Sequence, residues 1–62
     1  MNEFTNAEKY ECAQREVKQR ERVYKNRVEA GRMTQALADR QIALMRAIAA
    51  DYEKLALTER LI

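Results

Sequence analysis

The stretch VEAGRMT, residues 28–34, decides the fold because it holds the only glycine of the chain, between two long segments of helix-forming residues. Gly31 can adopt the left-handed backbone conformation that ends many helices. Thr34 can then cap the start of a new helix with its hydroxyl. There is no proline, and both flanks are rich in Ala, Leu, Glu, Lys, Arg and Gln. The sequence therefore predicts two helices joined by a turn.

The outer ends of the helices follow from local signals. Thr5 and Glu8 have the spacing of a capping box, in which each side chain satisfies a free backbone amide at a helix start. We expect a single helical-hairpin domain with a helix over about 6–30, a turn at 31–34 and a helix over about 35–60. The predicted fold class is all-α, an antiparallel two-helix hairpin that dimerises into a four-helix bundle.

Apolar residues at three- and four-residue steps predict which faces of the two helices meet. The expected seam consists of Tyr10, Ala13, Val17, Tyr24 and Val28, opposite Leu37, Ile42, Met45, Ile48, Tyr52, Leu55 and Ile62. Paired across an antiparallel hairpin, Val28 with Leu37, Val17 with Ile48 and Tyr10 with Leu55 have residue numbers with the same sum. A register shifted by one heptad also matches apolar residues, and the position of the turn selects between them.

The small size of the chain predicts that the protein associates with a second copy or with a larger protein. A chain of 62 residues has too little core for ample stability, and small domains compensate with disulfides, metals or oligomerisation. One cysteine and no histidine exclude an internal disulfide and argue against a metal site. We expect no cofactor, and a homodimer or a complex with a larger protein partner.

The charge and hydropathy of the chain indicate in which compartment the protein acts and which partners it can bind. Twelve basic and ten acidic residues are too balanced for a strong nucleic-acid field. No apolar run approaches the roughly 20 residues of a membrane span, and the N-terminal residues lack signal-peptide features. We expect a cytoplasmic protein without a membrane partner.

The second helix carries a further apolar face beside the expected seam. It comprises Ala36, Ala43, Ala47, Ala50, Leu57 and Leu61. Alanine is the best helix former, so the face has a plain structural interpretation. The alternative is a protein interface, because a helix that is apolar on two sides usually packs against two neighbours. These six residues are the predicted interface residues, towards a second copy or a host protein.

Catalytic chemistry has little support in the sequence. Histidine and serine are absent, so the familiar triads and the commonest general base are missing. Cys12 has no neighbouring base and is interpreted as a packed or half-exposed residue. The carboxylates of Asp39, Asp51 and Glu53 are assigned to a solvated face. We expect neither an enzyme nor a small-molecule substrate.

A ridge of four basic residues on the first helix supports the alternative function, a dimeric helical nucleic-acid-binding regulator. The ridge consists of Arg15, Lys18, Arg22 and Lys25. Such a ridge could contact several backbone phosphates. The competing interpretation is a solvent face of ion pairs at four-residue spacing. The expected pairs are Glu11 with Arg15, Glu16 with Arg20 and Glu21 with Lys25.

Arg20 and Glu21 interrupt the apolar stripe between Val17 and Tyr24. Their long side chains could lay their stems along the seam and keep their charges in water. Alternatively, a polar contact made by them could set the register or the choice of partner.

Several segments resemble small uncharacterised proteins of bacteriophages and prophages: YECA at 10–13, REV at 15–17, VY at 23–24, GRMT at 31–34 and IAADY at 48–52. The resemblance covers roughly residues 10–56 and supplies no catalytic or binding residues. It implies a phage-type accessory protein acting inside a bacterial cell. Such a protein would bind a host enzyme, regulator or defence complex and inhibit it by steric occlusion.

Overall fold

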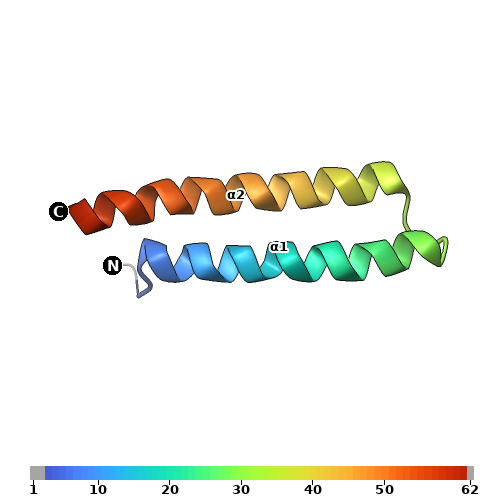
Figure 1. The fold of residues 1–62 in the computed structure, drawn as a ribbon, viewed down its shortest axis with the longest axis horizontal. Helices are drawn as coiled ribbons and strands as arrows, with labels where there is room; N and C mark the ends of the chain where they lie inside the picture. Colours follow the sequence, from blue (N-terminus) through green and yellow to red (C-terminus); the bar gives the residue numbers. More distant parts are fainter. Residues whose placement is uncertain (1–2, 62) are drawn as a thin grey trace.

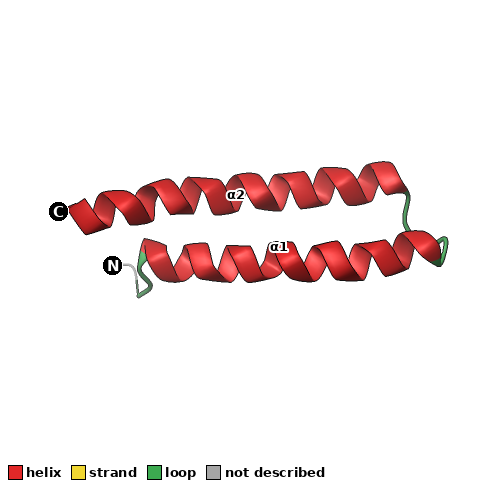
Figure 2. Cartoon of the chain, viewed as in Figure 1, coloured by secondary structure: helices red, strands yellow, loops and turns green. Residues whose placement is uncertain are grey.

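The computed structural model describes residues 3–61, which form two helices lying side by side (Figures 1 and 2). Helix α1 spans Asn6–Glu29 and α2 spans Gln35–Leu61. The two helices run antiparallel, so the start of α1 and the end of α2 lie at one end of the hairpin and the turn lies at the other (Figure 1). The molecule measures 47 × 17 × 17 Å. Within the described residues, neither helix is long and apolar enough to cross a membrane.

The predicted capping box begins α1. Thr5 has an extended backbone, and its Oγ1 accepts a hydrogen bond from the Glu8 amide at 3.0 Å. The Glu8 carboxylate in turn accepts from the Thr5 amide at 3.3 Å. Next to it, the Asn6 amide donates to the carboxylate of Glu59 near the end of α2. The start of α1 is therefore held both locally and by the opposite helix.

The turn closes as its glycine predicts. Gly31 has φ 73°, in the left-handed region, and its amide donates to the Val28 carbonyl. The Arg32 amide reaches back to the Arg27 carbonyl at 2.9 Å, which completes a Schellman motif at the end of α1. The Thr34 hydroxyl accepts from the Leu37 amide at 3.1 Å and caps α2.

The seam between the helices is built from alanines. Among residues 3–61, the buried residues are Ala13 of α1 and Ala38, Ala49 and Ala56 of α2. Ile42, Met45 and Tyr52 are half-buried beside them. The prediction that Leu37, Ile48 and Leu55 lie in this seam is wrong, because these side chains are 45, 38 and 47 % exposed. The predicted seam residue Ile62 lies outside the described residues.

The observed α2 is rotated about its own axis relative to the orientation that the sequence predicts. Leu37, Ile48 and Leu55 each directly precede one of the buried alanines. Successive helical residues differ by about 100° in direction, so burying the alanines turns the larger side chains to one flank. Alanine lets two helix backbones approach closely, while the longer side chains are accommodated beside the contact line.

Polar contacts across the seam involve the two charged residues that interrupt the apolar stripe of α1. Arg20 keeps its expected ion pair with Glu16 at 3.0 Å and also donates to the backbone carbonyl of Gln41 at 3.0 Å. Glu21 pairs with Arg46 of α2, so its expected pair with Lys25 is wrong. These contacts support the interpretation in which polar groups help to set the register.

Candidate interaction surfaces

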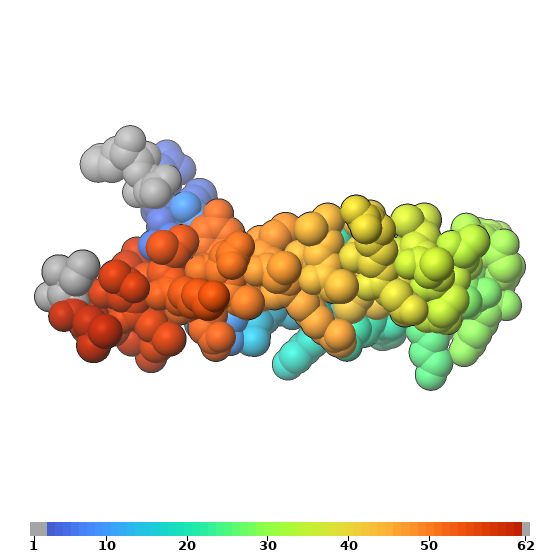
Figure 3. All heavy atoms as spheres, turned by 90° about the horizontal axis from the view of Figure 1, so that it is seen from above, coloured from blue at the N-terminus to red at the C-terminus, as the bar shows by residue number. Residues whose placement is uncertain are grey.

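The predicted interface residues lie along the outer side of α2, where Ala50 and Leu57 border the seam with α1. The four alanines of this set are exposed, Leu57 is 52 % exposed and Leu61 is 87 % exposed. Figure 3 views the molecule from the α2 side and shows this helix running uncovered along the hairpin. We call Ala36, Ala43, Ala47, Ala50, Leu57 and Leu61 the alanine face. The hairpin leaves this face free for contact with another surface.

A second apolar surface lies on one flank of α2, where the sequence had suggested seam residues. It consists of Leu37, Leu44, Ile48 and Leu55, between 38 and 52 % exposed, and we call it the aliphatic stripe. The residues are separated by steps of seven, four and seven, which return to nearly the same side of a helix. Sequence periodicity had found three of these residues but assigned them to the interior of the hairpin.

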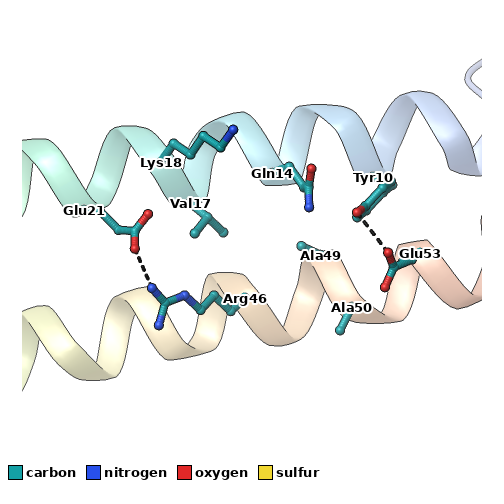
Figure 4. A pocket seen from close by; sticks show the side chains of 9 residues that line it. All are labelled: Tyr10, Gln14, Val17, Lys18, Glu21, Arg46, Ala49, Ala50 and Glu53. Carbon is teal, nitrogen blue, oxygen red and sulfur yellow. Dashed lines mark hydrogen bonds and ion pairs between the residues drawn. The ribbon is translucent and has the colours of Figure 1, made fainter.

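The opposite flank of the seam forms a shallow groove of about 300 Å³ (Figure 4). Two polar contacts bracket it: the Tyr10 hydroxyl donates to Glu53 at 3.0 Å, and Glu21 pairs with Arg46. Val17 and Gln14 of α1 and Ala49 of α2 lie between these contacts. The sequence does not predict that these groups lie together, because their contacts depend on how the two helices are rotated relative to one another.

The pKa of Tyr10 is raised, chiefly because its hydroxyl donates a hydrogen bond to the Glu53 carboxylate. Desolvation and the negative charge of Glu53 add to this rise, and the nearby Gln14 side chain opposes it. A phenol with a raised pKa stays neutral at physiological pH and is a poor general base. The groove thus holds a structural hydrogen bond and no activated group at Tyr10.

The basic ridge lies on the outer side of α1. All four of its side chains are exposed, namely those of Arg15, Lys18, Arg22 and Lys25. Across residues 3–61, no carboxylate lies within ion-pair distance of any of them. Glu16 and Glu21 pair with Arg20 and Arg46, and among residues 3–61 the expected pairs of Arg15 with Glu11 and of Lys25 with Glu21 are not formed.

The structure gathers few groups that could support catalysis or bind a metal. Cys12 is exposed, and its thiol is free. In the part of the chain that the structure describes, no three His, Cys, Asp or Glu residues cluster so that they could hold a metal ion. The most prominent exposed surfaces are the two apolar surfaces of α2 and the basic ridge of α1.

Comparison of the chain with known proteins points to no relative. No protein-family model matches it, and neither the curated proteins nor the solved structures yield a match.

Proposed function

We propose that this protein is a helical interaction module that binds another protein through α2. The supporting observation is the distribution of apolar side chains. Among residues 3–61, six of the seven large hydrophobic side chains that are exposed belong to α2, while the buried residues are all alanines. A hairpin that buries so little and exposes so much of one helix gains free energy when that helix is covered.

The chemistry of the alanine face suggests the kind of partner. Alanines at positions 43, 47 and 50 would allow close approach of a partner helix, and Leu57 and Leu61 would provide larger anchors at one end. Basic and acidic residues are equal in number in α2, so recognition would depend on shape and apolar contact more than on charge. Following the resemblance to phage proteins, the partner would be a bacterial enzyme, regulator or defence complex, blocked sterically by the rigid hairpin.

A matched pair of variants tests this function. Ala47→Glu places a charge in the middle of the alanine face, whereas Gln19→Glu places the same charge at an exposed position of α1. Tagged protein is used to capture partners from bacterial cytoplasm, and mass spectrometry identifies them. We expect a protein captured by the wild type and by Gln19→Glu to be lost with Ala47→Glu. Equal capture by all three proteins, or no capture by the wild type, would contradict the proposal.

A second candidate function is nucleic-acid binding by the basic ridge, and it is favoured because the ridge forms no ion pair within residues 3–61. Arg15 and Lys25, the ends of the ridge, are ten residues apart, or about 15 Å along the helix. The ridge could therefore follow a few successive phosphates of one strand. This function predicts binding to a nucleic-acid duplex that weakens steeply as salt is added.

Replacing all four ridge residues with glutamine tests the second function. If each contacts one phosphate, the slope of log affinity against log salt should fall by about 0.9 per contact. Glutamine preserves helix propensity, so circular dichroism should show an unchanged hairpin. A duplex that is not bound at low salt, or is bound equally by the glutamine variant, would exclude this role for the ridge.

A further inference from the structure

We propose that the aliphatic stripe binds a second copy of this chain, with the two α2 helices antiparallel about a twofold axis. This inference rests on the proposed function in one respect, namely that α2 is the interacting helix. It assigns self-association to Leu37, Leu44, Ile48 and Leu55, and it leaves the alanine face for a different protein.

The stripe is symmetric about one residue. Leu37 and Leu55 lie nine residues before and after Arg46, and Leu44 and Ile48 lie two residues before and after it. A twofold axis perpendicular to α2 at that level reverses the helix direction and exchanges these positions. Leu37 of one copy then faces Leu55 of the other, and Leu44 faces Ile48. Such self-complementarity is what an isologous interface requires.

The polar residues within the stripe favour the antiparallel orientation. Arg40 and Asp51 are eleven residues apart and therefore share one edge of the stripe, whereas Gln41 lies on the other edge. In the antiparallel pair like edges of the two copies adjoin, and Arg40 of one copy lies within about one residue of the level of Asp51 of the other, so opposite charges meet. In a parallel pair the edge with Arg40 and Asp51 would adjoin the edge with Gln41, and these opposite charges would not meet. Charge complementarity therefore selects the antiparallel arrangement.

The direction in which the stripe projects from α2 is also suitable for packing against a second hairpin. The stripe is turned by about 100° from the buried alanines, since Leu37, Ile48 and Leu55 directly precede them. In a square four-helix bundle each helix meets its two neighbours at directions about 90° apart. Helix α1 would thus occupy one neighbouring corner and the second copy's α2 the other. The contact from Leu37 to Leu55 would extend over roughly 27 Å.

A second copy suits the stripe better than an unrelated surface for a further reason. Among the described residues, no large side chain is fully buried within one hairpin. Two stripes placed together would bury the same apolar side chains from both copies, and each Asp51 would lie beside an Arg40 of the other copy.

Light scattering with two glutamate variants tests self-association. The wild type should have twice the 7.3 kDa mass of one chain. Leu44→Glu places two charges in the centre of the dimer and should raise its dissociation constant at least about a hundredfold. Ala47→Glu adds the same charge outside the stripe and should leave the mass unchanged. Circular dichroism should show both variants as helical as the wild type, since Leu44 and Ala47 are exposed in the hairpin.

A distance measurement tests the orientation. A spin label is attached to Ala36→Cys in a Cys12→Ser background, and the separation of the two labels is measured. In the antiparallel dimer the labelled residues are offset by about 20 residues, or roughly 30 Å along the helix axis. In a parallel dimer they would lie at the same level. In addition, Asp51→Asn should weaken the antiparallel dimer, because it removes the charge beside Arg40 of the other copy, and should leave a parallel dimer unchanged.

The results separate this inference from the proposed function. A monomeric wild type up to millimolar concentration, labels at the same level, or dissociation by Ala47→Glu in place of Leu44→Glu would each overturn the twofold stripe. A monomeric wild type whose partner is lost with Ala47→Glu would overturn this inference and retain the proposed function. A dimer broken by Leu44→Glu, with no partner captured, would retain the stripe and contradict the proposed function.

Discussion

Enlarging the seam alanine Ala49 to leucine should destabilise the hairpin, because the helices meet at this residue. Ala49 is 6 % exposed and lines the groove beside Val17. Leucine adds three carbon atoms where α1 already occupies the space, so either the helices separate or the side chain takes a strained rotamer. Overpacking of this kind costs about 1–3 kcal/mol.

This loss is large for so small a protein. Domains have about 0.05–0.15 kcal/mol of stability per residue, which is roughly 3–9 kcal/mol for this chain. A loss of 1–3 kcal/mol corresponds to a fall in Tm of roughly 5–20 °C. Thermal and urea unfolding followed by far-ultraviolet circular dichroism measure both quantities. Light scattering on the same samples checks that the variants are compared in the same oligomeric state.

Two further variants make the result specific to the seam. Ala47→Leu is the same substitution on the alanine face and should change stability by no more than about 0.5 kcal/mol. Val17→Ala, combined with Ala49→Leu, frees space on α1 and should recover part of the loss. If Ala49→Leu proves as stable as the wild type, or Ala47→Leu falls equally, the alanine seam is not the contact line of the hairpin.

Three smaller perturbations address the turn and the cross-helix contacts. Gly31→Ala should lower stability by about 1–2 kcal/mol in urea unfolding, because φ is 73° and the site is otherwise open; an unchanged midpoint would contradict the left-handed turn. Glu53→Gln should lower the pKa of Tyr10 in an ultraviolet titration. Because the pKa of Tyr10 is raised in the folded protein, its hydrogen bond to Glu53 stabilises the fold fully below the ordinary tyrosine pKa of about 10. This stabilisation is lost as the pH rises through the pKa of Tyr10 in the folded protein. A titration identical in both proteins would rule out the Glu53 contact. Arg46→Ala should cost at most about 1 kcal/mol by removing the exposed pair with Glu21, and the difference should shrink in high salt; a larger, salt-independent loss would indicate another role for Arg46.

The candidate surfaces show where sequence reasoning was sufficient and where it was not. The exposure of the basic ridge follows from its spacing, because four basic side chains at steps of three and four share one side of a helix. The sequence does not predict that the ridge forms no ion pair within residues 3–61, since Glu21 could pair with Lys25 on its own helix or with Arg46 on the other. Only the relative position of the helices decides between two cations within reach of one carboxylate.

The two helices and the turn between them could be derived from local chemistry. The capping of α1 by Thr5, the left-handed Gly31 and the capping of α2 by Thr34 each involve contacts between residues a few positions apart. Residues so close along the chain meet whatever the rest of the molecule does. For this reason the predicted helix ends agree with the structure to within one residue.

The face that α2 turns towards α1 was decided only by tertiary packing. Leu37, Ile48 and Leu55 recur at the same spacing as Ala38, Ala49 and Ala56, so periodicity alone cannot tell which set is buried. Hydrophobicity favours the larger residues, whereas close approach of two backbones favours alanine. In the packed hairpin the alanines contact α1, and the aliphatic stripe is exposed on the flank of the hairpin.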